Sequence, residues 1–123
     1  MGLEELNHSV TSAILRAEAL PAGSWEAERA FRDVAELEQE LAAILGAQTV
    51  EGEVARLGAV AASLSAGDLL RAVQLAERYL ADGLSDRSRK KLEQLHTEAE
   101  AAISSAAQAA PNVEPVPFSL RAA

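Results

Sequence analysis

Apolar residues recur every three or four positions in five separate segments of this chain, and glycine or proline interrupts the pattern between most of them. In the first segment, for example, the repeating positions are Leu3, Leu6, Val10 and Ile14. This spacing gathers apolar side chains on one face of an α-helix, whereas a half-buried strand would alternate with a period of two. The sequence therefore predicts five amphipathic helices.

The expected helices cover residues 2–20, 24–45, 50–64, 68–82 and 86–110. Capping residues are expected at four helix starts: Ser24, Thr49, the S-x-x-D box beginning at Ser65, and Ser85 or Asp86. Five helices with short connections imply antiparallel neighbours. The predicted fold class is thus all-α, an antiparallel bundle or a stack of helical hairpins.

The third and fourth expected helices carry apolar residues around much of their circumference. We therefore expect them to form the interior pair of the fold. The large residues predicted to lie in this core are Leu57, Leu64, Leu69, Val73 and Leu80.

Prolines at 111, 115 and 117 exclude a helix from the last part of the chain. The expected organisation is a helical domain over residues 1–110 and an extended tail over residues 111–123. The tail places Val116, Phe118 and Leu120 between or after its prolines. Such a segment is either a disordered terminus or a preformed extended element that docks into a groove.

The charge balance narrows the classes of partner. Nineteen acidic and eleven basic side chains give a net charge of −8, which disfavours binding to nucleic acid or to anionic membranes. No long uncharged apolar segment and no secretory signal pattern is present, so the expected location is the cytoplasm, in a bacterial type of cell. The chain has no cysteine, which removes thiolate chemistry.

A repeated E-x-x-H spacing is the main pattern that suggests chemistry. Glu5 and His8 lie in the first expected helix, and Glu93 and His96 lie in the last. Residues three apart share a helix face, and helical dimetal proteins use this spacing to bind metal. Helix phase, however, points Glu5 and His8 away from the apolar face. We therefore expect solvated histidines and no cofactor, with a metal-binding helical enzyme or carrier as the alternative.

A basic cluster opens the fifth expected helix, where cations oppose the helix dipole. It is either a solvated first turn or a docking site for an acidic protein surface. Its members are Arg87, Arg89, Lys90 and Lys91.

Trp25 lies on the side of the second expected helix that faces away from Phe31 and Leu41. It either packs on the end of the first helix or is exposed as an anchor for a partner. Both possibilities stay open at this point.

No phosphate-binding glycine loop, nucleophile elbow or Ser/His/acid set occurs in the sequence. We therefore expect a non-catalytic protein–protein interaction module, such as an adaptor, regulator, chaperone or assembly component. The expected partner-binding residues are Trp25, the four basic residues, and Val116, Phe118 and Leu120 of the tail. Self-association as a homo-oligomer is also expected.

Overall fold

In the computed structural model the described part of the chain, residues 2–109, forms five α-helices and no strand. The helices are α1 (Leu3–Glu18), α2 (Trp25–Ile44), α3 (Val50–Ser65), α4 (Leu69–Leu80) and α5 (Asp86–Ala109). The all-α prediction is confirmed, and the helices lie close to their predicted positions. The predicted tail, residues 111–123, falls outside the described residues.

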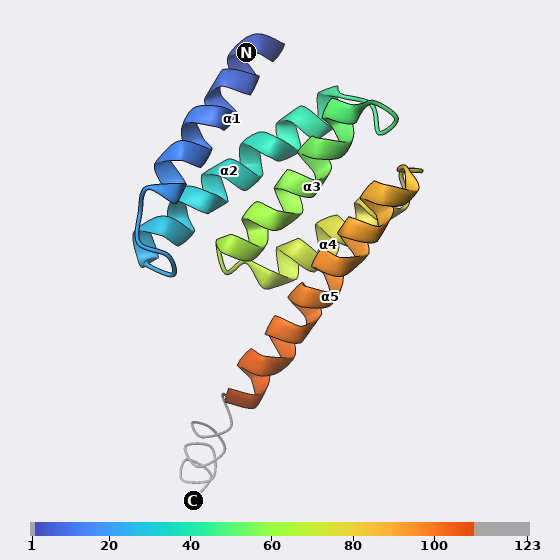
Figure 1. Ribbon diagram of the computed structural model, residues 1–123. Coiled ribbons are helices and arrows are strands. Elements are labelled where there is room, and N and C mark those ends of the chain that lie inside the picture. The colour runs from blue at the N-terminus through green and yellow to red at the C-terminus, as the bar shows by residue number, and fades with distance from the viewer. Residues whose placement is uncertain (1, 110–123) are drawn as a thin grey trace, which may run out of the picture.

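The helices follow one another in space as they do along the chain, from α1 at one edge to α5 at the other (Figure 1). Each packs against its neighbours in sequence, and α3 also contacts α5. The molecule is therefore a row of antiparallel helical hairpins. Because α3 packs against α2, α4 and α5, it forms the centre of this row.

Side chains cap three of the helices as the sequence predicts. Ser24 Oγ accepts a hydrogen bond from the Ala27 N–H at 3.1 Å. Thr49 Oγ1 accepts one from the Gly52 N–H at 3.0 Å. At the start of α5, Ser85 Oγ accepts a hydrogen bond from the Ser88 N–H at 3.3 Å. All three bonds satisfy N–H groups that have no partner within the first turn of a helix.

The predicted capping box at Ser65 is wrong, because Ser65 is the last residue of α3. The Asp68 N–H donates to the Ser63 carbonyl at 2.9 Å, and the Gly67 N–H donates to the Leu64 carbonyl at 3.0 Å. These two bonds form a Schellman motif, which closes a helix C-terminus. Gly67 has a φ of +73°, a left-handed conformation that favours glycine. The segment therefore ends α3 before it begins α4.

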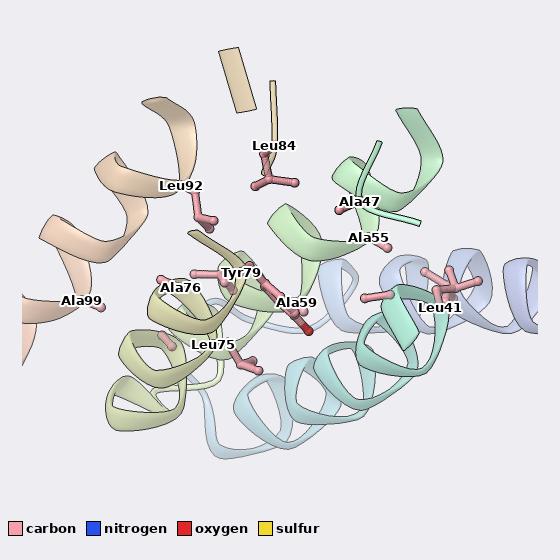
Figure 2. Packing of buried hydrophobic residues seen from close by; sticks show 14 of the residues in the cluster. Leu41, Ala47, Ala55, Ala59, Leu75, Ala76, Tyr79, Leu84, Leu92 and Ala99 are labelled. Atoms are coloured by element: carbon pink, nitrogen blue, oxygen red, sulfur yellow. The ribbon is translucent and has the colours of Figure 1, made fainter. Parts of the chain in front are cut away.

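Small side chains make the closest contacts between the helices. More than half of the buried apolar residues are alanines, and Ala55 and Ala59 of α3 are among them. Larger residues fill the space between α4 and α5, where Leu92 points toward Ala76 and Tyr79 (Figure 2). Alanine contacts let helix backbones approach closely, so a continuous core forms with few large side chains.

The predicted interior pair is only partly correct. α3 is central, but α4 packs mainly on α3 and α5. The five large residues that were expected in the core are half-buried, and they flank the alanine contacts: Leu57, Leu64, Leu69, Val73 and Leu80. Small residues occupy the closest approach of two helices because large ones would hold the backbones apart.

The second half of α5 extends beyond the other helices (Figure 1). Ala99 is buried, Ala102 is half-buried, and residues 103–109 are exposed. The apolar face of α5 therefore has packing partners only as far as Ala102. None of the helices within residues 2–109 is both long enough and apolar enough to cross a bilayer.

The core assignment predicts how truncations affect stability. Leu92 is 0% exposed, so Leu92→Ala should lower the free energy of unfolding by about 2–5 kcal/mol. Leu70 is exposed, and Leu70→Ala should change that free energy by no more than about 0.5 kcal/mol. Urea denaturation followed by circular dichroism measures both. Equal losses in the two variants would contradict this core.

Candidate functional site

Two valines on α3 are exposed although the sequence predicts that this helix is buried on two sides. Val50 is 73% exposed and Val54 is 59% exposed. The opposite side of α3 is buried against its neighbours, as expected, through Ala55 and Ala59. The expectation of burial is therefore wrong for one face of the N-terminal half of α3. We call Val50 and Val54 the α3 ridge.

The α1–α3 groove lies on one side of this ridge and has a volume of about 300 Å³. Its floor is formed by α2, on which both α1 and α3 pack. Its apolar lining comes from Val10, Ile14, Leu41, Leu45 and Ala55, together with the α3 ridge. Two carboxylates, those of Glu38 and Glu51, also line it.

The α3–α5 groove lies on the other side of the ridge, with a volume of about 340 Å³. Val50 and Val54 line it as well, so the ridge separates the two grooves. Two members of the predicted basic cluster, Arg87 and Lys91, line its far wall on α5. Arg89 and Lys90 do not line this groove. The structure thus brings half of the basic cluster next to an apolar surface.

Glu38 is the most unusual charged residue in the α1–α3 groove. It is only 7% exposed, and its carboxylate lies directly against Gly58 of α3. Any side chain at position 58 would overlap this carboxylate, so the close contact requires glycine there. Burial raises the pKa of the Glu38 carboxyl to about 7. The sequence gives no direct signal for this, since Glu38 looks like part of an acidic outer face.

Glu53 connects α3 to the start of α5. Its carboxylate accepts hydrogen bonds from the Ser85 N–H at 2.8 Å and from the Ser88 hydroxyl at 2.9 Å. These bonds lower the pKa of Glu53, with the backbone N–H of Ser85 as the main cause. Because Glu53 lies beside Leu57 and Val60 on the third expected helix, the sequence predicts that it either pairs with Arg56 or lies at a rim. The pairing is wrong, because Glu53 caps a neighbouring helix instead.

Arg56 is a buried cation that links three helices. Its Nε donates to Asp82 Oδ2 at 3.0 Å, just after α4. Its Nη1 donates to the carbonyl of Leu45 at 3.1 Å, at the end of α2, and to that of Gly52 at 2.9 Å. The guanidinium also lies 5.5 Å from the centre of the Tyr79 ring. These contacts tie the ends of α2 and α4 to α3, and a lone cation in a helix rich in small residues is the sequence signal for such a role.

The first E-x-x-H pair is exposed, as its helix phase predicts. Glu5 and His8 both face solvent. His8 lines a separate cleft of about 690 Å³ between α1 and α2, together with Glu36, Glu40 and Arg16. Within residues 2–109, however, no three His, Asp or Glu side chains are placed to hold one metal ion.

The two residues of the second E-x-x-H pair have different surroundings. His96 is half-buried, and its Nε2 lies 3.1 Å from Glu77 Oε2 of α4. Its Nδ1 lies 3.5 Å from Oε1 of Glu100. The expectation of a solvated histidine is therefore wrong for His96, which joins α5 to α4. Glu93 remains exposed.

Trp25 begins α2 and is 67% exposed, and its role as an anchor for a partner stays a prediction. The Arg29 guanidinium lies 5.4 Å from the centre of its ring. The start of α2 and the start of α5 lie at opposite ends of the molecule (Figure 1). The structure therefore does not join Trp25 to the basic cluster. Val116, Phe118 and Leu120 fall outside the described residues.

Comparison of the chain with protein-family models, with curated proteins and with solved structures finds no match.

The raised pKa of Glu38 predicts a pH-dependent stability. Between its ordinary value of 4.5 and about 7, the folded protein keeps a proton that the unfolded chain releases. The free energy of unfolding should therefore fall as the pH rises through this window. We expect Glu38→Gln to be more stable than the wild type at pH 8 and to lose this part of the pH dependence.

Thermal unfolding at pH 5 and pH 8 measures the effect. The exposed Glu40→Gln, on the same helix, is the matched control and should keep the wild-type pH dependence. If both variants behave alike, the carboxyl of Glu38 does not titrate in the way described.

The capping of α5 by Glu53 predicts a contrast between two glutamates in the first turn of α3. Glu53→Gln should lower the melting temperature at pH 7, since a neutral amide accepts more weakly from Ser85 and Ser88. Glu51→Gln should change it little, because Glu51 is exposed. Because the pKa of Glu53 is lowered in the folded protein, its advantage is present above the ordinary value of 4.5 and is lost as the pH falls below that value through the folded pKa. Equal melting temperatures in both variants at pH 7 would refute this role.

Proposed function

We propose that this protein is a non-catalytic protein–protein interaction module, an adaptor, regulator, chaperone or assembly component. Its binding site is the α3 docking surface, which consists of the α3 ridge and the α1–α3 and α3–α5 grooves beside it. The observation that supports this most strongly is the exposure of Val50 and Val54 between two grooves. Apolar side chains grouped in this way on a protein surface are typical of contact sites.

The shape of the surface favours a segment of polypeptide over a small molecule. The two grooves are open and share one ridge, so a bound chain could cross both and contact the valines between them. Small-molecule sites, in contrast, enclose most of their ligand. An extended or helical segment with several apolar side chains suits this surface better.

The charges on the two sides of the α3 ridge favour one orientation of a bound segment. Glu38 and Glu51 line the α1 side, whereas Arg87 and Lys91 line the α5 side. A segment with a cation at one end and an anion at the other would bind in one orientation, and its reversed copy would meet like charges. The surface therefore favours specific binding over general adhesion of apolar chains.

The proposal is tested by placing a charged side chain on the apolar α3 ridge. Val54→Asp should abolish the capture of partner proteins from an extract of the native host, while Leu70→Asp should preserve it. Leu70 is the matched control because it is similarly exposed but lies on α4, away from the docking surface. Proteins are identified by mass spectrometry, and calorimetry with the purified partner should show at least a tenfold weaker affinity for Val54→Asp.

Circular dichroism first establishes that both variants remain folded. Equal affinity of the wild type and Val54→Asp for every captured protein would refute the proposed site.

A further inference from the structure

We propose that the segment bound by the α3 docking surface is the C-terminal segment, residues 111–123, of a second copy of this chain. This inference rests on the proposed function and names its partner. The apolar residues of the segment contact the α3 ridge, Glu114 faces Arg87 and Lys91, and Arg121 faces the exposed carboxylate of Glu51.

The apolar residues of the segment suit the ridge. Val116, Phe118 and Leu120 are each two positions apart, so they share one side of an extended chain. Pro115 and Pro117 disfavour any helical alternative and reduce the entropy lost on binding. Three apolar side chains on one side match a ridge of two valines with an apolar floor in the α1–α3 groove.

The charges of the segment match those of the docking surface. Residues 111–123 contain a single acidic side chain, Glu114, and a single basic one, Arg121. In the same strand-like extended conformation the two are about 23 Å apart. The path from α5 to the α1–α3 groove crosses α3, which is one helix spacing of about 8–10 Å and then part of the groove, so a segment of this length is long enough to span it. Glu114 and Arg121 can therefore meet opposite charges at the same time.

The length of the chain points to a second copy. From Lys91 to Ala109, α5 rises about 27 Å. Residues 110–114 span at most about 17 Å even when fully extended, so Glu114 cannot reach Lys91 of its own chain without stretching both side chains completely. Arg87 lies a further turn away. Glu114 of one molecule can reach Lys91 of another, because the length of α5 does not limit a contact between two molecules.

Docking between copies has a consequence for assembly. If two molecules exchange their segments, a closed dimer results, whereas one-way docking produces an open chain of molecules. Both forms depend on protein concentration. Self-association is therefore the direct measure of this inference.

The experiment is sedimentation velocity over a range of concentrations at low ionic strength, with the full chain. The wild type should associate, and Lys91→Glu should weaken association at least tenfold. The double variant Lys91→Glu with Glu114→Lys should restore it, because the pair is opposite in charge again. Arg32→Glu is the matched control: it reverses a charge at an exposed position of α2 and should leave association unchanged.

A synthetic peptide of residues 111–123, added in excess to the full chain, should dissociate the assembly, and its Glu114→Lys version should do so much less well. A wild type that remains monomeric at all concentrations would overturn the inference. So would association that the peptide and Lys91→Glu leave unchanged. Neither result decides the proposed function. That function is tested separately, by the affinity of Val54→Asp for a partner protein other than this chain.

Discussion

The close packing of α3 through alanine is the constraint on which the rest of the structure depends. Ala55 and Ala59 allow the neighbouring helices to approach the α3 backbone. Several larger side chains of α3 then lie at the flanks, where Leu57 is half-buried and Val54 is exposed, although Val60 is fully buried. The exposed ridge is thus a direct consequence of how the core is built.

Three buried or half-buried charges hold the helices in their order. Arg56 joins the ends of α2 and α4, and Glu53 caps the start of α5 from α3. Glu38 lies against Gly58, where burial favours its neutral form. Such contacts are directional, whereas alanine packing is not, so they select one arrangement among several that a row of similar helices could adopt.

Periodicity and capping residues were sufficient to predict the fold class and most helix ends, because both depend on local sequence. Which apolar face is buried could not be predicted in the same way, as Leu64 and Val54 show, because it depends on how closely two helices approach. The serine partners of Glu53, and Glu77 as the partner of His96 on α4, lie far away in sequence and have no local signal. Arg87 and Lys91 were identified as candidates, but only the structure places them beside the α3 ridge.

The central claim is that the α3 ridge is open in a single molecule and covered when a second one binds. Because the chain has no cysteine, thiol labelling of Val54→Cys tests this directly, with Val60→Cys as the buried reference on the same helix. Labelling of Cys at position 54 should be fast in dilute protein and should slow as the concentration rises, while position 60 stays protected. Protection of position 54 at every concentration, or a rate that never changes with concentration, would contradict the account.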